Sequence, residues 1–194
     1  MGGLRVKKKS QSVRNANLHI GIKTKRIFIG KRFGKRQYVL IDEDDYLNVF
    51  RVKKKGKYKK PFVSWFPWRK DKFSTIYALS GLGKMHRYIL CLKKNDGIST
   101  DHKNGDGLDN RRCNIRICTS RENSQNRKKD RTGKQRFKGV HFLTEKNFTH
   151  PYLAHIGFNG KTIKIGTFKT DKEAAKAYDK KAIELFGEFA RTNF

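Results

Sequence analysis

Asp101 and His102 stand next to each other in a polar segment rich in Asn and Gly. An imidazole with a pKa near neutrality can take a proton from water. A carboxylate and an amide oxygen together suit a hard divalent cation and leave room for phosphate oxygens and water. Hydrolysis of a phosphodiester bond needs these groups, and an amide such as Asn114 can fix the orientation of the histidine or pin the loop. The sequence therefore predicts a hydrolytic site that uses Mg²⁺ or Mn²⁺.

The elements expected around this pair bring it against a helix. Residues 98–102 are expected to form a short strand that ends at the Asp-His pair, and a long polar loop follows. Residues 115–118 are expected to form a second strand. Thr119 and Glu122 have the spacing of a capping box, which predicts the start of a helix. A strand, loop, strand and helix in this order place the pair beside the first turns of the helix.

The segment DHKNGDGLDNRRCNIRICTSREN resembles the HNH nuclease motif, and KMHRYIL resembles the segment that precedes it. The closest form is the variant of phage and intron homing endonucleases in which the last His is Asn. The resemblance implies that Asp101 is the first metal ligand and that His102 is the general base. It also implies 5′-phosphate and 3′-hydroxyl products and an origin in a phage, a virus or another mobile genetic element.

The same resemblance assigns roles to asparagines. It implies that Asn114 orients the base and that Asn123 is the second metal ligand. We favour these two asparagines for the two roles because Asn114 directly precedes the second strand and Asn123 lies in the first turn of the helix. Asn110 is the alternative to Asn114, and Asn126 is the alternative to Asn123. His86, in the preceding segment, is expected to be structural.

The composition indicates a nucleic-acid partner. The chain has 47 Lys and Arg against 17 Asp and Glu, which gives a formal net charge of +30. A chain with this imbalance repels itself unless it works beside a polyanion, and each phosphate that it neutralises releases a counterion. Double-stranded DNA is the expected partner, and Arg111, Arg112 and Arg116 are expected to contact its phosphates. The sequence gives no sign of an obligate protein partner.

The sequence argues against a membrane protein and against a zinc protein. It contains no apolar span, and its start, MGGLRVKKKSQS, lacks the apolar centre of a signal peptide. We therefore expect an intracellular protein, in the cytoplasm or nucleoid of a host cell or in the nucleus of a eukaryotic host. Cys91, Cys113 and Cys118 include no CxxC pair, so no structural zinc is expected.

The C-terminal segment has the most regular pattern. FKGVHF, PYLAHIGF and KTIKIGTF are predicted strands, and Asn159-Gly160 between the last two is a strong hairpin signal. Thr170 and Glu173 form a capping box before an alanine-rich helix, and Gly187 stands where a C-terminal glycine cap belongs. The pattern predicts a small three-stranded antiparallel sheet packed on one helix.

Residues 136–194 resemble the plant ethylene-response-factor (APETALA-type) DNA-binding domain through KGV, IGTF, EAAKAYDKKA and the final Asn-Phe. The resemblance implies that the sheet enters the major groove of DNA. The equivalent face of this sheet would include the following residues: Lys138, His141, His155, Thr162 and Lys164. Several of these positions are Arg or Trp in that family, and Lys lacks the planar fork that reads guanine. We therefore expect weaker base discrimination here.

The expected fold class is α+β, with a ββα-metal (HNH) nuclease domain followed by the small sheet-and-helix domain. The expected divisions are a basic arm over 1–26, a nuclease domain over 27–126 with its catalytic core over 84–126, a basic linker over 127–135 and a DNA-binding domain over 136–194. This organisation predicts site-directed cleavage of double-stranded DNA, of the homing type. The alternative is a DNA-binding regulator or architectural protein that has lost cleavage, and retention of the Asp-His pair argues against it.

Overall fold

The computed structural model describes residues 22–50, 54–55, 58–59, 63–72, 74–93, 95–127, 135–144 and 149–194. Residues 1–21 of the expected arm and residues 128–134 of the expected linker lie outside the described residues. β1 begins at Thr24, inside the range expected for the arm. The described elements mix helices with several small antiparallel sheets, which confirms the α+β expectation.

Short elements make up the first two thirds of the chain. Their bounds are β1 (Thr24–Arg32), β2 (Lys35–Asp42), α1 (Glu43–Val49), β3 (Lys54–Lys55), β4 (Tyr58–Lys59), β5 (Phe66–Trp68), β6 (Tyr77–Ser80), β7 (Gly83–Lys84), α2 (Met85–Ile89), β8 (Ser99–His102), β9 (Ile115–Cys118) and α3 (Ser120–Gln125). β1 pairs with β2, β3 with β4 and β8 with β9, and β5, β6 and β7 form a three-stranded sheet. All of these pairings are antiparallel.

An apolar core packs these elements together. Val39 and Ile41 alternate with more exposed residues along β2, so both face the core. There they meet Val49 of α1 and Met85 of α2, all four with no exposed surface. Ile115 of β9 belongs to the same cluster. The predicted catalytic segment is thereby attached to the same core as the first strands.

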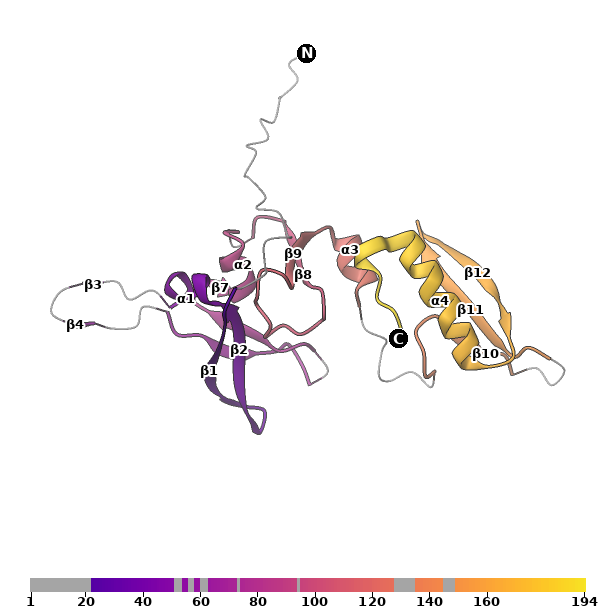
Figure 1. Ribbon diagram of the computed structural model, residues 1–194, viewed down its shortest axis with the longest axis horizontal. Coiled ribbons are helices and arrows are strands. Elements are labelled where there is room, and N and C mark those ends of the chain that lie inside the picture. Colours follow the sequence, from indigo (N-terminus) through magenta and orange to yellow (C-terminus); the bar gives the residue numbers. More distant parts are fainter. Residues whose placement is uncertain are drawn as a thin grey trace, which may run out of the picture.

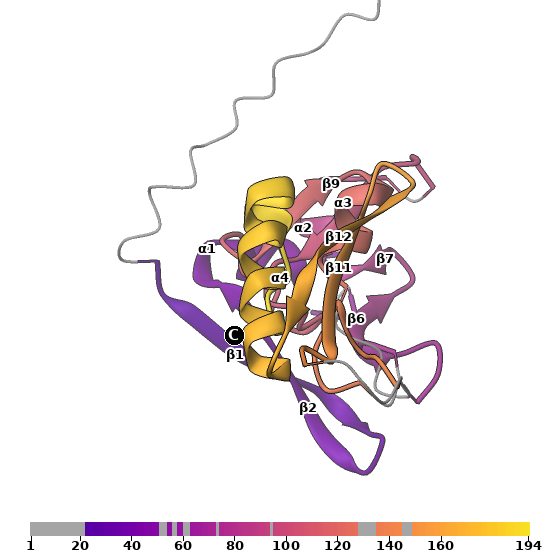
Figure 2. The same cartoon turned by 90° about the vertical axis from the view of Figure 1, so that its right-hand side faces the viewer.

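The C-terminal part has the three strands and the helix that its pattern predicts. Their bounds are β10 (Val140–Phe142), β11 (Tyr152–Phe158), β12 (Lys161–Phe168), α4 (Asp171–Phe186) and the short 3₁₀ helix η2 (Gly187–Phe189). The strands are antiparallel in the order β10-β11-β12, and α4 lies along one face of the sheet (Figure 2). The Thr170 hydroxyl accepts from the Glu173 amide, and the Glu173 carboxylate accepts from the Thr170 amide, as a capping box requires.

Small residues allow α4 to approach the sheet closely. Ala174, Ala175 and Ala182 of α4 are fully buried against it. Gly139 has a φ of 73°, and a Cβ at this position would lie 2.0 Å from Cδ2 of Tyr178. Both the backbone conformation and the space therefore require glycine. None of the helices in the described part of the chain is long and apolar enough to cross a membrane.

Candidate active site

Asp101 and His102 are the last two residues of β8, as the sequence predicts. The strand pairs with β9, and Asp101 lies opposite Arg116. Both side chains are buried, with exposed fractions of 7% for Asp101 and 4% for His102. Successive side chains of a strand point to opposite faces. Asp101 accordingly contacts Arg116, while His102 lies against the rings of Tyr77 and His86.

The buried amide of Asn110 contacts the His102 ring. His102 Nε2 lies 3.3 Å from Asn110 Oδ1, and a neutral ring that donates from Nε2 keeps its lone pair on Nδ1. The Asn110 amide donates to Leu108 O at 3.2 Å, and its backbone N–H donates to Leu40 O at 2.8 Å. Burial lowers the pKa of His102 below its usual value, although the hydrogen bond with Asn110 and the charge of Asp101 oppose this shift. The ring is therefore neutral near pH 7, the form that can accept a proton.

Asn114, the favoured candidate for orienting the base, contacts the loop instead. Its Nδ2 donates to the backbone oxygen of Asp109 at 2.7 Å, and its Oδ1 accepts from the backbone N–H of Asn104 at 3.0 Å. Of the two candidates, the structure brings Asn110 to His102. Asn114 has the second role that the sequence allowed, which is to pin the loop.

Asn126, the residue that follows α3, reaches Asp101. Its Nδ2 lies 3.0 Å from Oδ1 and 2.8 Å from Oδ2 of the carboxylate. Asn123, the favoured second metal ligand, is exposed one turn earlier on the helix. Its backbone N–H donates to Thr119 O, and no hydrogen bond joins it to Asp101 in the described part of the chain. The structure therefore brings the alternative residue, and not the favoured one, to the carboxylate.

Arg111 and Arg112, expected on phosphates, are both paired with carboxylates of the chain itself. Arg111 donates to the two oxygens of Asp109 at 2.8 and 2.7 Å, and Arg112 donates to those of Asp45 at 2.8 and 2.7 Å. Sequence reasoning placed Asp45 among acidic residues at the start of a helix, and it paired neither carboxylate with an arginine. The sequence does draw attention to both carboxylates, because Asp109 lies within the LDN part of the motif and Asp45 lies in the acidic run at the start of α1.

Arg116, the third arginine expected to contact DNA phosphates, is buried beneath the C-terminal part. Its Nη2 and Nε donate to Asp101 Oδ2 at 2.8 and 3.2 Å, and its Nη1 donates to Glu188 O at 2.7 Å. The guanidinium also lies 3.8 Å from the centre of the Phe189 ring. Only 9% of the Arg116 side chain is exposed, and its guanidinium is occupied by partners within the chain.

A protein of Acanthamoeba polyphaga mimivirus described as an uncharacterized HNH endonuclease is similar to this chain. The two are 37% identical over 142 residues, which cover 70% of this chain and 71% of the mimivirus protein. The chain belongs to the HNH endonuclease family. No family model matches it, and no solved structure gives a significant match. The family membership agrees with the resemblance of the segment around Asp101 to the HNH motif.

The surroundings of Asn126 suit a metal of the type that HNH nucleases use. Its one NH₂ group lies within 3.3 Å of four oxygens, namely both oxygens of Asp101 and the backbone oxygens of His102 and Lys103. Convergent hard oxygens that include a carboxylate are the donors that Mg²⁺ and Mn²⁺ prefer. No group of three or more His, Cys, Asp or Glu side chains that could hold a metal occurs in the described residues. Asp101 and the backbone oxygens of His102 and Lys103 are therefore the donors that fit a hard cation here, and Asn126 joins them only when its amide turns so that Oδ1, in place of Nδ2, faces Asp101.

The His86 side chain packs against the His102 ring. The two rings lie edge to face with their centres 4.6 Å apart, and the Tyr77 ring contacts both. His86 is 3% exposed, and its Nδ1 is buried without a hydrogen-bond partner. Burial lowers its pKa to about 2, and the neighbouring His102 adds to the shift. His86 is thus held neutral, packed as the structural residue that the sequence predicts.

Three of the residues expected to contact DNA gather on the C-terminal sheet of this HNH-family chain. His155 of β11 lies opposite Lys164 of β12, and the His141 ring of β10 lies 4.5 Å from the His155 ring. Ala154 and Ile156 flank His155 on β11 and are buried in the clusters that include α4. His141, His155 and Lys164 therefore lie on the face away from the helix.

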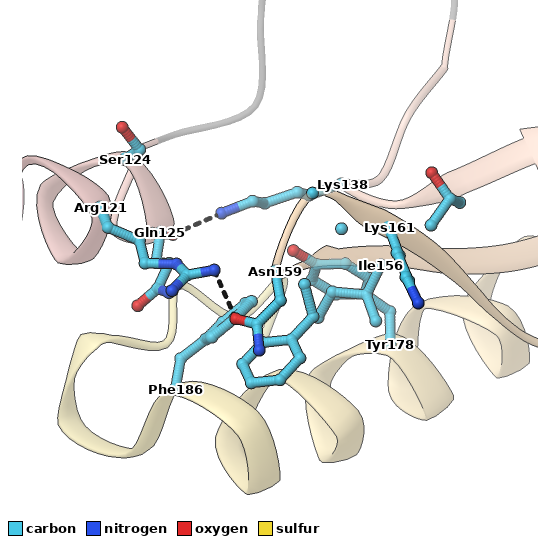
Figure 3. Close-up of a pocket in the computed structure, with 13 residues that line it drawn as sticks. Arg121, Ser124, Gln125, Lys138, Ile156, Asn159, Lys161, Tyr178 and Phe186 are labelled. Carbon is cyan, nitrogen blue, oxygen red and sulfur yellow. Dashed lines mark hydrogen bonds between the residues drawn. The ribbon is translucent and has the colours of Figure 1, made fainter.

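Lys138, another residue expected to contact DNA, is directed toward α3 instead. Its Nζ donates to the backbone oxygens of Gln125 at 2.7 Å and Arg127 at 2.9 Å. Burial lowers its pKa to about 8. A cavity of about 490 Å³ lies between α3, the β11–β12 hairpin and α4. Figure 3 shows Lys138 at this cavity, where Arg121 contacts Asn159 of the turn. The Lys138 ammonium stabilises the C-terminal end of α3, so it is not presented on the sheet face.

Proposed function

We propose that this chain is a metal-dependent endonuclease that hydrolyses phosphodiester bonds of double-stranded DNA, with His102 as the general base. The observation that carries the proposal is the contact between His102 and Asn110 beside the buried Asp101 carboxylate. A neutral ring that donates from Nε2 has its lone pair on Nδ1, where it accepts a proton from the attacking water. The description of the mimivirus relative supports a nuclease function.

Asp101 and Asn126 would hold the divalent cation, Mg²⁺ or Mn²⁺, and the Asn126 amide would turn so that its Oδ1, in place of Nδ2, faces the cation. Asn123 is the alternative second ligand. The bound metal would stabilise the negative charge on the departing 3′ oxygen. β8, β9 and α3 would then form the ββα-metal unit of the HNH nucleases. Arg116 would act as a positioning residue, because its two hydrogen bonds to Oδ2 fix the Asp101 carboxylate.

The C-terminal part would position the duplex and direct cleavage to a site, as in homing endonucleases. His141, His155 and Lys164 share one face of its sheet, and the resemblance to ethylene-response-factor domains supports contact of that face with a DNA groove. Arg111 and Arg112 remain phosphate contacts in this proposal. Their side chains are 35% and 46% exposed, and a guanidinium has five N–H donors, so pairing with one carboxylate leaves others for phosphate.

Cleavage of DNA by the full chain tests the proposal. Supercoiled plasmid and a random-sequence duplex library are incubated with the protein in Mg²⁺, in Mn²⁺ and in EDTA. We expect nicked or linear products in metal and none in EDTA. His102→Ala is expected to lower the cleavage rate by about 10²–10⁴-fold, the usual contribution of a general base. Circular dichroism of the variant checks that it is folded.

His150→Ala is the matched control, because the same substitution is made far from β8 in the C-terminal part. It is expected to cleave at the wild-type rate. Nicking that survives His102→Ala, or absence of cleavage of every substrate in both metals, would overturn the assigned mechanism. Duplex binding without cleavage would instead favour the alternative, a DNA-binding regulator.

A further inference from the structure

The β1–β2 ribbon is a strongly basic element outside the site described above. Residues 22–41 contain seven Lys and Arg and no Asp or Glu; the seven are Lys23, Lys25, Arg26, Lys31, Arg32, Lys35 and Arg36. Four of them lie at the tip as two cross-strand pairs, Lys31 opposite Arg36 and Arg32 opposite Lys35, and all four are exposed. Like charges opposite each other destabilise a ribbon. A neighbouring anion would relieve this repulsion.

One face of the ribbon is covered by the core and the other is open. Val39 and Ile41 are fully buried on the first face. On the second face Phe28 is 50% exposed and lies opposite Tyr38, with their ring centres 5.5 Å apart. The Arg26 guanidinium lies 4.1 Å from the centre of the Tyr38 ring. The open face therefore combines aromatic surface with positive charge.

The base of the ribbon is bonded to the catalytic loop. Leu40 of β2 donates its N–H to Leu108 O at 2.9 Å and accepts the N–H of Asn110 at 2.8 Å. Asn110 in turn contacts the His102 ring. The ribbon is thus fixed relative to His102 through one residue, while Figures 1 and 2 show its tip extending away from the body of the protein.

We propose that the β1–β2 ribbon binds the duplex beside the catalytic segment and fixes the position of the scissile bond relative to His102. A two-stranded ribbon fits the major groove of B-DNA. Its two strands carry six Lys and Arg and one carboxylate, the buried Asp42, and Lys25 pairs with Glu43 of α1. The exposed cations of the tip are therefore the charges that match the phosphates. From Leu40 to Lys35 the strand covers roughly 17 Å, about five base pairs, so both elements reach the same duplex. The inference rests on the proposed DNA-cleaving function, and DNA binding measured without metal tests it separately.

Charge reversal at the tip, Lys31→Glu with Arg36→Glu, removes one cross-strand pair of cations. The matched control is Lys172→Glu with Lys176→Glu on the exposed side of α4, which changes the net charge by the same amount. Affinity for a 30-base-pair duplex is measured by fluorescence anisotropy in EDTA at several salt concentrations. We expect the tip variant to bind at least about tenfold more weakly than the control. We also expect the slope of log K against log salt to become less steep, by the amount that corresponds to about two lost phosphate contacts.

Phe28→Ala tests the open face without changing the charge. It is expected to weaken binding several-fold while leaving the salt slope unchanged, because an apolar contact releases no counterions. All of the substituted side chains are exposed, so thermal unfolding is expected to match the wild type.

A tip variant with the same affinity and salt slope as the α4 control would overturn the inference. So would a wild-type dimer, seen by light scattering, that Phe28→Ala dissociates, because the open face would then belong to a contact between copies. A wild-type chain that binds through the ribbon in EDTA but cuts no DNA in Mg²⁺ or Mn²⁺ would retain the ribbon as a binding element and overturn the nuclease function alone.

Discussion

Arg116 joins Asp101, the carboxylate proposed to hold metal, to Glu188 in the C-terminal part. Its Nη2 lies 2.8 Å from Asp101 Oδ2, and its Nη1 lies 2.7 Å from the backbone oxygen of Glu188. The two contacts come from different nitrogens of one buried guanidinium, and the Phe189 ring lies against it. The position of Asp101 therefore depends on the segment that follows α4, although the two are far apart in the sequence.

Arg116→Leu is expected to destabilise the fold, because it leaves the Asp101 carboxylate buried without its ion pair. Breaking a buried pair in this way costs about 3–5 kcal/mol. Glu188→Gln is expected to cost less than about 1 kcal/mol, since that side chain is 67% exposed and the backbone oxygen that accepts from Arg116 remains. Urea unfolding followed by circular dichroism measures both variants.

The double variant Asp101→Asn with Arg116→Leu checks the cause of the expected loss. It removes the unpaired charge, so its loss of unfolding free energy should be smaller than the sum of the two single losses. Additive losses would mean that the two side chains do not interact in solution.

Asn110→Ala and Asn114→Ala separate orientation of the base from pinning of the loop. Asn110→Ala removes the partner of His102 Nε2, and a misplaced base is expected to lower the cleavage rate by about 10²-fold with DNA affinity unchanged. Asn114→Ala leaves the N–H of Asn104 without its acceptor and is expected to cost about 1–3 kcal/mol of unfolding free energy. Single-turnover kinetics and urea unfolding are measured on both. The reverse pattern would support the role that the family resemblance gives to Asn114.

Local patterns were sufficient to predict the elements that carry the site. β8, β9 and the start of α3 follow from short strand patterns and from the capping box of Thr119 and Glu122, whose hydrogen bonds all lie within a few residues. The C-terminal sheet and helix follow from similar signals. A capping box or a hairpin turn is formed by neighbours in the sequence, so it can be predicted without the rest of the fold.

Contacts between residues far apart in the sequence determine which asparagine meets His102 and where Arg116 lies. Which asparagine meets His102 depends on the path of the loop, and that path is fixed by backbone bonds to Leu40 on a strand far earlier in the chain. Arg116 was expected to contact DNA phosphates, as an arginine beside the catalytic segment of a strongly basic chain. Its burial comes from Glu188, 72 residues later. Strand alternation alone could not indicate that the C-terminal part covers this position.

Asn126→Ala and Asn123→Ala test which amide completes the metal site. Asn126 contacts the Asp101 carboxylate, whereas Asn123 is exposed one turn away. Asn126→Ala is therefore expected to weaken Mn²⁺ binding by at least about tenfold, and Asn123→Ala is expected to leave it unchanged. The readout is the rise in melting temperature on addition of Mn²⁺, which needs no DNA and depends on the fraction of metal-bound protein. A loss of that rise in Asn123→Ala alone would restore Asn123 as the second ligand.

His86 is expected to make the stability of the fold fall in mild acid. Its pKa is about 2 in the folded chain against a usual value of 6.5, so below about pH 6.5 the unfolded chain binds a proton that the folded chain excludes. The unfolding free energy then falls as the pH decreases, by up to about 1.4 kcal/mol per pH unit. His86→Phe keeps a ring of similar shape, removes the unpartnered Nδ1, and should lose about 2 kcal/mol less than the wild type between pH 6.5 and pH 5. His150→Phe serves as the control and is expected to follow the wild-type curve. Urea unfolding at several pH values measures the three proteins, and parallel curves for His86→Phe and the wild type would show that His86 is not held neutral in the core.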